Sequence, residues 1–172
     1  MPAMTIRLLL VKTPIILAIV LLSLQAAWAG PATLSGAVVR VYDGDTIEVA
    51  QLGKVRLIGI DAPEFKASRR DRFYLRRNIS AATLRRVARR ARAFLVDKAQ
   101  GRQVDLTTDH TRRDRYGRLL AYVRLPDGRL LNRLLVEAGL ASVYRRFDFR
   151  LKADFLAAES EAQRAGRGMW GK

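Results

Sequence analysis

The chain has 172 residues, 49% hydrophobic and 28% charged, which is enough for one modest domain and an additional N-terminal segment. Its 32 Lys and Arg against 16 Asp and Glu give a formal net charge of +16. Such a charge favours a polyanionic partner, nucleic acid before lipid or glycan, over a merely solvated basic surface. The lack of cysteine excludes disulfides, thiolate metal sites and a cysteine nucleophile, and the single His110 excludes a histidine metal cluster.

The N-terminus has the pattern of a secretory signal peptide. A positive start precedes an apolar run over 14–24, and Ala27-Trp28-Ala29 supplies the ending after which we expect cleavage. An uncleaved anchor is the alternative, but the apolar stretch is at the short limit for a bilayer span and Gln25 interrupts it. We predict a signal peptide over 1–29, a domain over 30–172, and a periplasmic or extracellular protein that meets the membrane only transiently.

Three short strand patterns open the predicted domain. They are rich in β-branched residues, and in the first of them Val39 and Val41 alternate with Arg40. The three runs are 35–42, 46–50 and 55–60, with turn signals at Asp43-Gly44-Asp45 and Leu52-Gly53-Lys54. This order predicts an antiparallel meander, a common beginning for a small barrel that binds nucleic acid.

A rigid turn follows the third predicted strand. In Asp61-Ala62-Pro63-Glu64 the proline fixes its own φ and biases the preceding residue to an extended shape. The turn therefore holds Asp61 and Glu64 at a fixed offset.

The next segment is rich in arginine. We interpret residues 65–80 as a surface loop and predict an amphipathic helix over 81–99, where apolar residues recur at three- and four-residue spacing. The helix arginines that fall mostly on its other side are Arg85, Arg86, Arg89, Arg90 and Arg92. This basic face is either a solvated surface or a flank that attracts phosphate, and the two are compatible.

Two more strands and two more helices complete the chain. Strands are predicted over 103–108 and 119–125, a helix capped by Asn132 runs to Ala138, and a last helix covers 151–165. Trp170 is expected to plug the core. The class is α+β, with five strands and three helices.

Asp45 and Asp61 are the candidate metal ligands. In the predicted hairpin both lie at neighbouring strand ends, where two carboxylates and a backbone carbonyl would form a partial cage of hard oxygen atoms. Such a cage suits calcium or magnesium rather than zinc. Taken alone, Asp43-Gly44-Asp45 is more simply a hairpin turn.

Arg56, Arg118 and Glu64 add the chemistry of phosphate. Guanidinium groups bind phosphate oxygens bidentately and neutralise the charge that builds up during attack. A carboxylate beside a metal-bound water can accept its proton. Each residue alone is more often surface decoration or a turn residue, but together they predict metal-assisted attack on a phosphodiester.

The motifs VYDGDTIEV, VRLIGIDAPE, RDRYGRLLAYV and LNRLLVEAGLASV together resemble the staphylococcal nuclease (thermonuclease) family, from about Val38 to Trp170. The resemblance implies a five-stranded OB-fold β-barrel with three α-helices. It also implies calcium-dependent hydrolysis of DNA and RNA, with Mg²⁺ the less favoured ion. Separately, we expect a monomer, and nothing in the sequence implies a protein partner.

The resemblance also implies residue roles. Asp45, Asp61 and the backbone carbonyl of Ala62 would hold the metal, Glu64 would be the general base, and Arg56 and Arg118 would bind phosphate. Asp43 would shape the acidic pocket, Asp114 and Tyr116 would support the loop of Arg118, and Tyr144 would contact the substrate.

The chain departs from the family pattern in the long arginine-rich segment after Glu64 and around Tyr144, which bear on base preference and product length. Two alternatives belong to other classes. One is a non-catalytic OB-fold nucleic-acid-binding protein, against which the complete set of acids and arginines argues. The other is a membrane-tethered basic protein, which an uncleaved N-terminus would favour.

Overall fold

A computed structural model describes residues 33–171. The predicted signal peptide, and the predicted domain start at residue 30, lie outside the described residues. Within 33–171, none of the helices combines the length and apolar character needed to cross a membrane.

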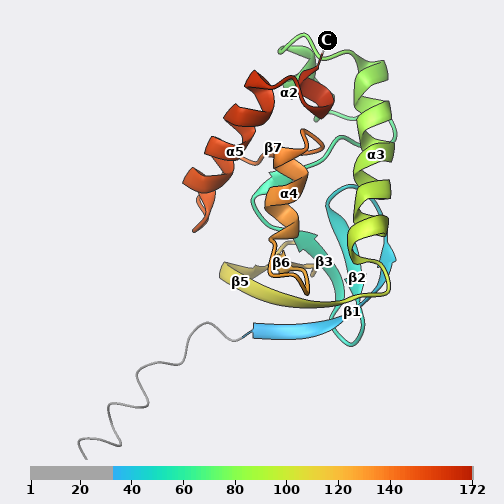
Figure 1. The fold of residues 1–172 in the computed structure, drawn as a ribbon, viewed down its shortest axis with the longest axis vertical. Coiled ribbons are helices and arrows are strands. Elements are labelled where there is room, and N and C mark those ends of the chain that lie inside the picture. Colours follow the sequence, from blue (N-terminus) through green and yellow to red (C-terminus); the bar gives the residue numbers. More distant parts are fainter. Residues whose placement is uncertain (1–32, 172) are drawn as a thin grey trace, which may run out of the picture. The chain divides into compact units, whose positions relative to one another are not determined.

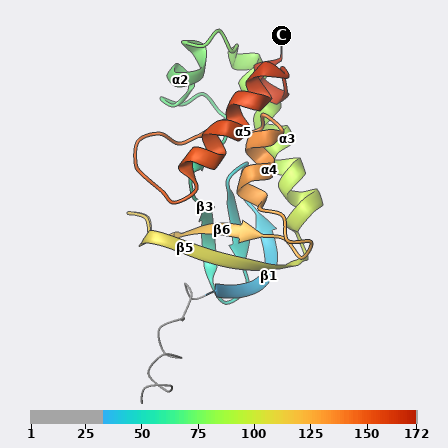
Figure 2. The same cartoon turned by 60° about the vertical axis from the view of Figure 1, so that its left-hand side comes forward.

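Five strands close into a barrel (Figures 1 and 2). They are β1 (Thr33–Val41), β2 (Thr46–Val49), β3 (Gly53–Leu57), β5 (Gln103–Arg113) and β6 (Leu119–Arg124). Their order around the barrel is β1-β2-β3-β6-β5, and all neighbours are antiparallel except β3 and β6. The predicted meander and the five-stranded barrel of the OB-fold are thus confirmed.

The helices gather at one end of the barrel (Figures 1 and 2). They are α2 (Asp71–Leu75), α3 (Ala81–Ala99), α4 (Leu131–Glu137) and α5 (Lys152–Arg164), followed by the 3₁₀ turn η2 (Gly168–Trp170). The α+β class is confirmed, with four described helices instead of three. α3 packs against β1 and α4, and α4 packs on β6 and α5.

The alternation of apolar residues in the strands builds the core, with one correction in β1. Val38 and Val41 are buried, whereas Val39 is exposed. The register of β1 against β2 shifts between Val38 and Arg40, and this bulge reverses the expected alternation. Near the C-terminus Met169 is buried, whereas Trp170, which was expected to fill the core, is only partly buried and packs against it.

The third strand ends earlier than predicted. β3 stops at Leu57, because Gly59 has a φ of 81° and turns the chain out of the barrel. An added Cβ at Gly59 would lie 2.6 Å from the ring of Phe149. After this turn, β4 (Ile60–Asp61) pairs with β7 (Ser142–Val143) in a separate two-stranded sheet. Asp61 therefore lies in a strand, not after one.

The segment 65–80 is not simply a surface loop. It contains α2, and Tyr74 in this helix is fully buried. The Tyr74 hydroxyl donates to the backbone carbonyl of Asp61 at 2.9 Å and lies 3.0 Å from Ser142 Oγ. Arginines on both sides of the short apolar run Phe73-Tyr74-Leu75 give the segment the overall polarity of a loop, so the sequence does not reveal the buried tyrosine.

Asn132 lies inside α4 instead of capping it. Leu130 is the residue before the helix, and the Asn132 side chain points into the barrel end, fully buried. Its Oδ1 accepts from Val123 N at 2.9 Å, and its Nδ2 donates to Ile58 O at 2.9 Å and Ala121 O at 3.2 Å. One amide thus joins α4 to two segments of the barrel.

Replacing Asn132 by alanine should lower the free energy of unfolding by about 3 kcal/mol, because three buried backbone groups each lose a hydrogen bond to the amide. Urea denaturation measures the change. Gln163→Ala, on the exposed side of α5, is the control and should change it by no more than about 0.5 kcal/mol. A loss below 1 kcal/mol for Asn132→Ala would contradict the role assigned to the amide.

Candidate active site

Arg56 bridges the two candidate metal carboxylates. Its Nη1 is hydrogen-bonded and ion-paired to Asp45 Oδ1, and its Nη2 lies 2.9 Å from Asp61 Oδ1. Nη2 also donates to the Ile60 carbonyl at 3.3 Å. Only 12% of the Arg56 side chain and 5% of that of Asp45 are exposed. The sequence-predicted proximity of Asp45 and Asp61 is thus present in the structure.

The barrel register explains why these groups meet. Arg56 in β3 lies opposite Thr46 in β2 and opposite Leu120 in β6. Asp45 immediately precedes β2, and Arg118 immediately precedes β6. Because β2, β3 and β6 are neighbouring strands, Asp45, Arg56 and Arg118 lie close together at one edge of the barrel.

Gly44 lets the two acidic segments approach each other. A Cβ at this position would lie 2.6 Å from Ala62 Cβ and 2.7 Å from Ala91 Cβ of α3. Any side chain would therefore push the Asp43–Asp45 turn away from Asp61 and from the helix. The Ala62 N–H donates to Asp45 Oδ2 at 3.0 Å, which closes this contact.

Burial shifts the pKa values of the acids at this site. Burial, and then the Asp45 carboxylate, raise the pKa of Asp61 to about 6, although Arg70 and Arg56 oppose the rise. Burial and Asp45 likewise raise the pKa of Asp43 to about 6. For Arg56 burial acts to lower the pKa, but the carboxylates of Asp45 and Asp61 outweigh it and the pKa is raised. The loss of solvent, and then the neighbouring Asp45 carboxylate, therefore disfavour the charged forms of Asp43 and Asp61.

Arg118 is held by Asp114, as the sequence predicts. Asp114 Oδ2 accepts from Arg118 Nε at 2.8 Å and from its Nη2 at 2.6 Å, while Oδ1 accepts from the backbone N–H groups of Tyr116 and Arg118. The third guanidinium nitrogen, Nη1, lies 3.4 Å from Thr46 Oγ1, which itself donates to Asp45 Oδ1. Partial burial acts to raise the pKa of Asp114, but the hydrogen bonds from Arg118 outweigh it and the pKa is lowered.

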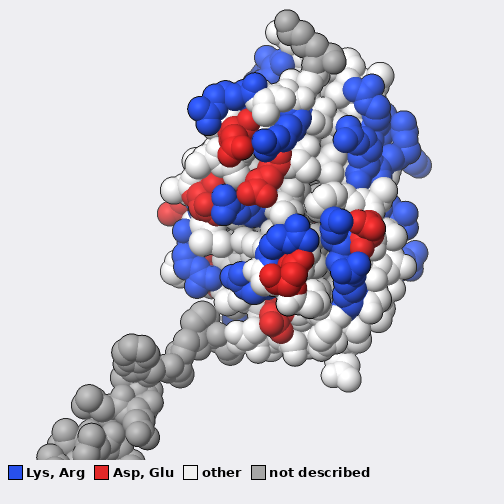
Figure 3. All heavy atoms as spheres, viewed as in Figure 1, with Lys and Arg blue, Asp and Glu red and all other residues white. Residues whose placement is uncertain are grey.

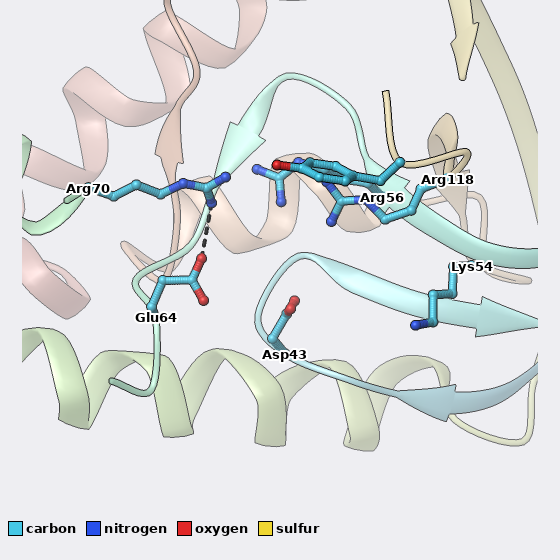
Figure 4. Close-up of a pocket in the computed structure, with 7 residues that line it drawn as sticks. Asp43, Lys54, Arg56, Glu64, Arg70 and Arg118 are labelled. Atoms are coloured by element: carbon cyan, nitrogen blue, oxygen red, sulfur yellow. Dashed lines mark hydrogen bonds and ion pairs between the residues drawn. The ribbon is translucent and has the colours of Figure 1, made fainter. Parts of the chain in front are cut away.

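Arg56 and Arg118 line a hollow of about 290 Å³ (Figure 4), whereas Asp45 and Asp61 are not among its lining residues. Its lining residues are Asp43, Lys54, Arg56, Glu64, Arg70, Tyr116 and Arg118. Glu64 and Asp43 lie on one side, and Arg70 enters from the opposite direction to Arg56 and Arg118. Four cationic side chains and two carboxylates thus line one opening.

Tyr116 and Tyr144 have different positions relative to the hollow. The Tyr116 side chain is 68% exposed and lines the hollow, and its ring centroid lies 5.5 Å from the guanidinium carbon of Arg118. Its hydroxyl accepts from Nη2 of Arg115 in the same loop at 2.7 Å. Tyr144 is not among the residues that line the hollow, and its ring packs on Phe147 with centroids 4.9 Å apart. The expected contact of Tyr144 with the substrate stays a prediction.

Two residues of the hollow were missed by the sequence analysis. Lys54 lies two positions before Arg56 in β3, so both project from one face of the strand, and this spacing is a usable signal. Arg70 is one of many arginines in its segment, and nothing in its local pattern distinguishes it.

A divalent cation fits the donor set. Asp45, Asp61 and the Ala62 carbonyl offer hard oxygen atoms. Asp61 Oδ2 accepts no hydrogen bond from residues 33–171, and the raised pKa values of Asp43 and Asp61 indicate a charge that a cation would relieve. In the same part of the chain no group of three His, Cys, Asp or Glu side chains is arranged to hold a metal, so solvent or substrate would complete the shell.

The sequence is similar to known proteins of one nuclease family. Residues 54–172 match the family described as "Staphylococcal nuclease homologue". The chain is 33% identical over 164 residues to a micrococcal nuclease of Shigella flexneri, covering 89% of this chain and 81% of that one. It is 32% identical over 171 residues to a thermonuclease of Staphylococcus hyicus, covering 91% and 93%.

A third relative, an uncharacterized endonuclease of Escherichia coli O157:H7, is 35% identical over 142 residues, or 81% of this chain and 78% of its own. The chain belongs to the staphylococcal nuclease family. The matched range contains Arg56, Asp61, Glu64 and Arg118, whereas Asp45 precedes it. As a staphylococcal nuclease family protein, the chain brings the two expected metal carboxylates, Asp45 and Asp61, into contact with Arg56.

The raised pKa of Asp43 generates a prediction about stability. With a folded-state pKa of about 6 against an ordinary value of 3.8, Asp43 favours folding below pH 4, and this contribution is lost as pH rises through 6. Asp43→Asn keeps the oxygen that accepts from Asp45 N and removes the charge. Without metal, it should raise the free energy of unfolding at pH 7.5 by about 1 kcal/mol.

Urea denaturation in chelator at pH 7.5 and at pH 4 measures this effect, which should fade at the lower pH. Asp148→Asn, at a carboxylate whose side chain is 92% exposed, serves as control and should leave stability unchanged at both pH values. A variant Asp43→Asn that is less stable than wild type at pH 7.5 would show that the charge is compensated in the folded state.

Proposed function

We propose that this protein is an exported nuclease that depends on a divalent cation, calcium before magnesium, and hydrolyses phosphodiester bonds of DNA and RNA. The observation that carries the proposal is the bridge of Arg56 across Asp45 and Asp61, beside Arg118 and open to Glu64. Its similarity to a micrococcal nuclease and to a thermonuclease supports the proposal.

The residues divide the reaction between them. Asp45, Asp61 and the Ala62 carbonyl would hold the cation, which when bound polarises a phosphoryl oxygen and lowers the pKa of water. Arg118, oriented by Asp114, and Arg56 would bind the equatorial oxygens and stabilise the charge that develops on them. Glu64, whose Oε1 faces the hollow, would accept the proton of the attacking water.

The lining of the hollow supports a substrate range that includes both DNA and RNA. It consists of two carboxylates, four cations and one aromatic ring, and has no side-chain amide or aliphatic hydroxyl to bind a base edge or a ribose hydroxyl. These groups address phosphate, which DNA and RNA share. Tyr116, exposed at the rim, can stack on any base.

The surface charge supports recruitment of a polyanion. Lys and Arg gather over α3 (right side of Figure 3). Arg86, Arg89 and Arg90 are exposed there, whereas Arg85 is half-buried and ion-paired with Asp71. The predicted basic face is therefore present, except that Arg85 is engaged in an ion pair with Asp71. Binding to nucleic acid should weaken steeply as the salt concentration rises.

The nuclease proposal predicts the effect of two substitutions. Glu64→Gln and Arg118→Ala should each lower the rate of plasmid and RNA cleavage by about 10²–10³-fold, through loss of the proton acceptor and of a phosphate ligand. The assay compares calcium, magnesium and chelator. Glu161→Gln and Arg129→Ala, two exposed residues that pair with Arg167 and Asp127, are the matched controls.

Cleavage that is unchanged in chelator would overturn the dependence on metal. Tight binding of nucleic acid without cleavage under any cation would instead support a non-catalytic OB-fold binding protein. Neither substituted side chain lies in the core, so circular dichroism should show a native fold for all four variants.

The export proposal predicts a mature chain that begins at Gly30. Expression of the full chain in a Gram-negative host, followed by N-terminal sequencing of the periplasmic and medium fractions, measures the cleavage site. The mature protein would lack Arg7 and Lys12, which lowers Lys plus Arg from 32 to 30 against 16 acids. Full-length protein retained in the membrane fraction would support the anchor instead.

A further inference from the structure

Arg70 reaches two acidic residues of the site from the arginine-rich segment. Its Nη1 lies 2.9 Å from Asp61 Oδ1 and 3.1 Å from Glu64 Oε1. Asp61 Oδ1 thus accepts from both Arg70 and Arg56, whose Nη2 is also 2.9 Å away. In Figure 4 the guanidinium of Arg70 extends over Glu64 toward the side from which Arg118 enters.

The backbone that carries Arg70 is firmly anchored. The next residue, Asp71, is buried and is ion-paired with Arg85 Nη2 of α3 at 2.6 Å. Asp71 also accepts from Ser68 N and Ser68 Oγ, both at 3.4 Å. Three residues further on, Tyr74 is hydrogen-bonded to the Asp61 carbonyl. The fold therefore fixes Cα of Arg70 beside the site from two directions.

The side chain of Arg70 is held much less firmly than its backbone. It is 43% exposed, and ion pairs at such exposure contribute little to stability. The adjacent Arg69 and nearby Arg72 are exposed and make no side-chain hydrogen bond or ion pair within residues 33–171. In this part of the segment, Arg70 alone is directed at the carboxylates, by contacts that can be exchanged.

A divalent cation on Asp61 would compete with Arg70. Arg70 pairs with Oδ1 of Asp61 and the cation would bind the other oxygen, Oδ2, so the two positive charges would repel each other and the cation would weaken the pair between Arg70 and Asp61. The freed guanidinium remains at the mouth of the hollow because its backbone is anchored. A phosphate of the substrate then offers it the planar, bidentate partner that arginine prefers.

We propose that Arg70 is a further substrate-binding residue. In the free protein its guanidinium is paired with Asp61 and Glu64, and it binds a substrate phosphate once a divalent cation occupies the acidic site. This assignment rests on the proposed function, since it needs a nucleic-acid substrate in the same hollow. It also gives the anchored part of the arginine-rich segment a role in the site.

The test measures binding of a trinucleotide with phosphorothioate linkages, a ligand short enough to occupy the hollow alone and slow to be cleaved. Wild type, Arg70→Gln, Arg70→Lys and the matched control Arg72→Gln are titrated with calcium and with chelator. With calcium, Arg70→Gln should weaken binding about tenfold and Arg72→Gln less than about twofold. Arg70→Lys should recover part of the loss, because lysine keeps the charge without the bidentate geometry.

In chelator the loss for Arg70→Gln should shrink to about threefold or less, because the wild-type arginine is then engaged by Asp61 and Glu64. Equal losses in Arg70→Gln and Arg72→Gln, or the same loss with and without calcium, would overturn the assignment. Plasmid cleavage by the wild type reports separately on the proposed function. A wild type that binds the trinucleotide in this calcium-dependent way but never cleaves plasmid would contradict the nuclease proposal and still support Arg70 as a residue that binds nucleic acid.

Discussion

The buried guanidinium of Arg56 is the interaction on which the site depends. It sits on the central strand of the β2–β3–β6 edge and neutralises part of the charge of two acids from different segments. Without it, Asp45 and Asp61 would repel each other in a nearly water-free position. Removal of one partner from such a buried set is expected to be strongly destabilising, because the remaining charges are left uncompensated. Stability and chemistry are therefore coupled at this residue.

The position of Asp61 depends on residues far along the chain. Asp61 pairs with Ser142 in the β4–β7 sheet, and Val143 N of β7 donates to the buried Glu159 of α5 at 2.8 Å. Glu159 is neutralised by Arg145, with which it is ion-paired. A connected series of contacts thus runs from the last helix through β7 to a site carboxylate. The C-terminal helix, which contributes no side chain to the hollow, fixes one wall of the site.

The sequence predicts most of the barrel and the core of the site because those signals are local. The Asp43-Gly44-Asp45 turn, the alternation in β2 and β3, and the α3 periodicity each depend on a few neighbouring residues, and α3 is found over the residues predicted. The errors involve tertiary contacts. Asn132 is a good cap by residue type, but three backbone groups of the barrel bind it instead, and Tyr74 is buried although its neighbours suggest a loop. Arg70 could not be singled out, since only the fold distinguishes it from the arginines around it.

The opposing charges of the hollow suggest how metal and substrate would help each other in the proposed mechanism. The acids Asp43, Asp45 and Asp61 repel one another, and so do Lys54, Arg56, Arg70 and Arg118. In the free protein ion pairs between the two sets offset part of this repulsion, so neither a cation nor an anion alone would gain the full attraction of its set. In the proposed mechanism, a cation bound by the acids would free guanidinium donors for phosphate, and a bound phosphate would draw those donors away from the carboxylates. Because such coupling is reciprocal, a modest affinity for the cation alone is compatible with a firmly held cation in the complex with substrate.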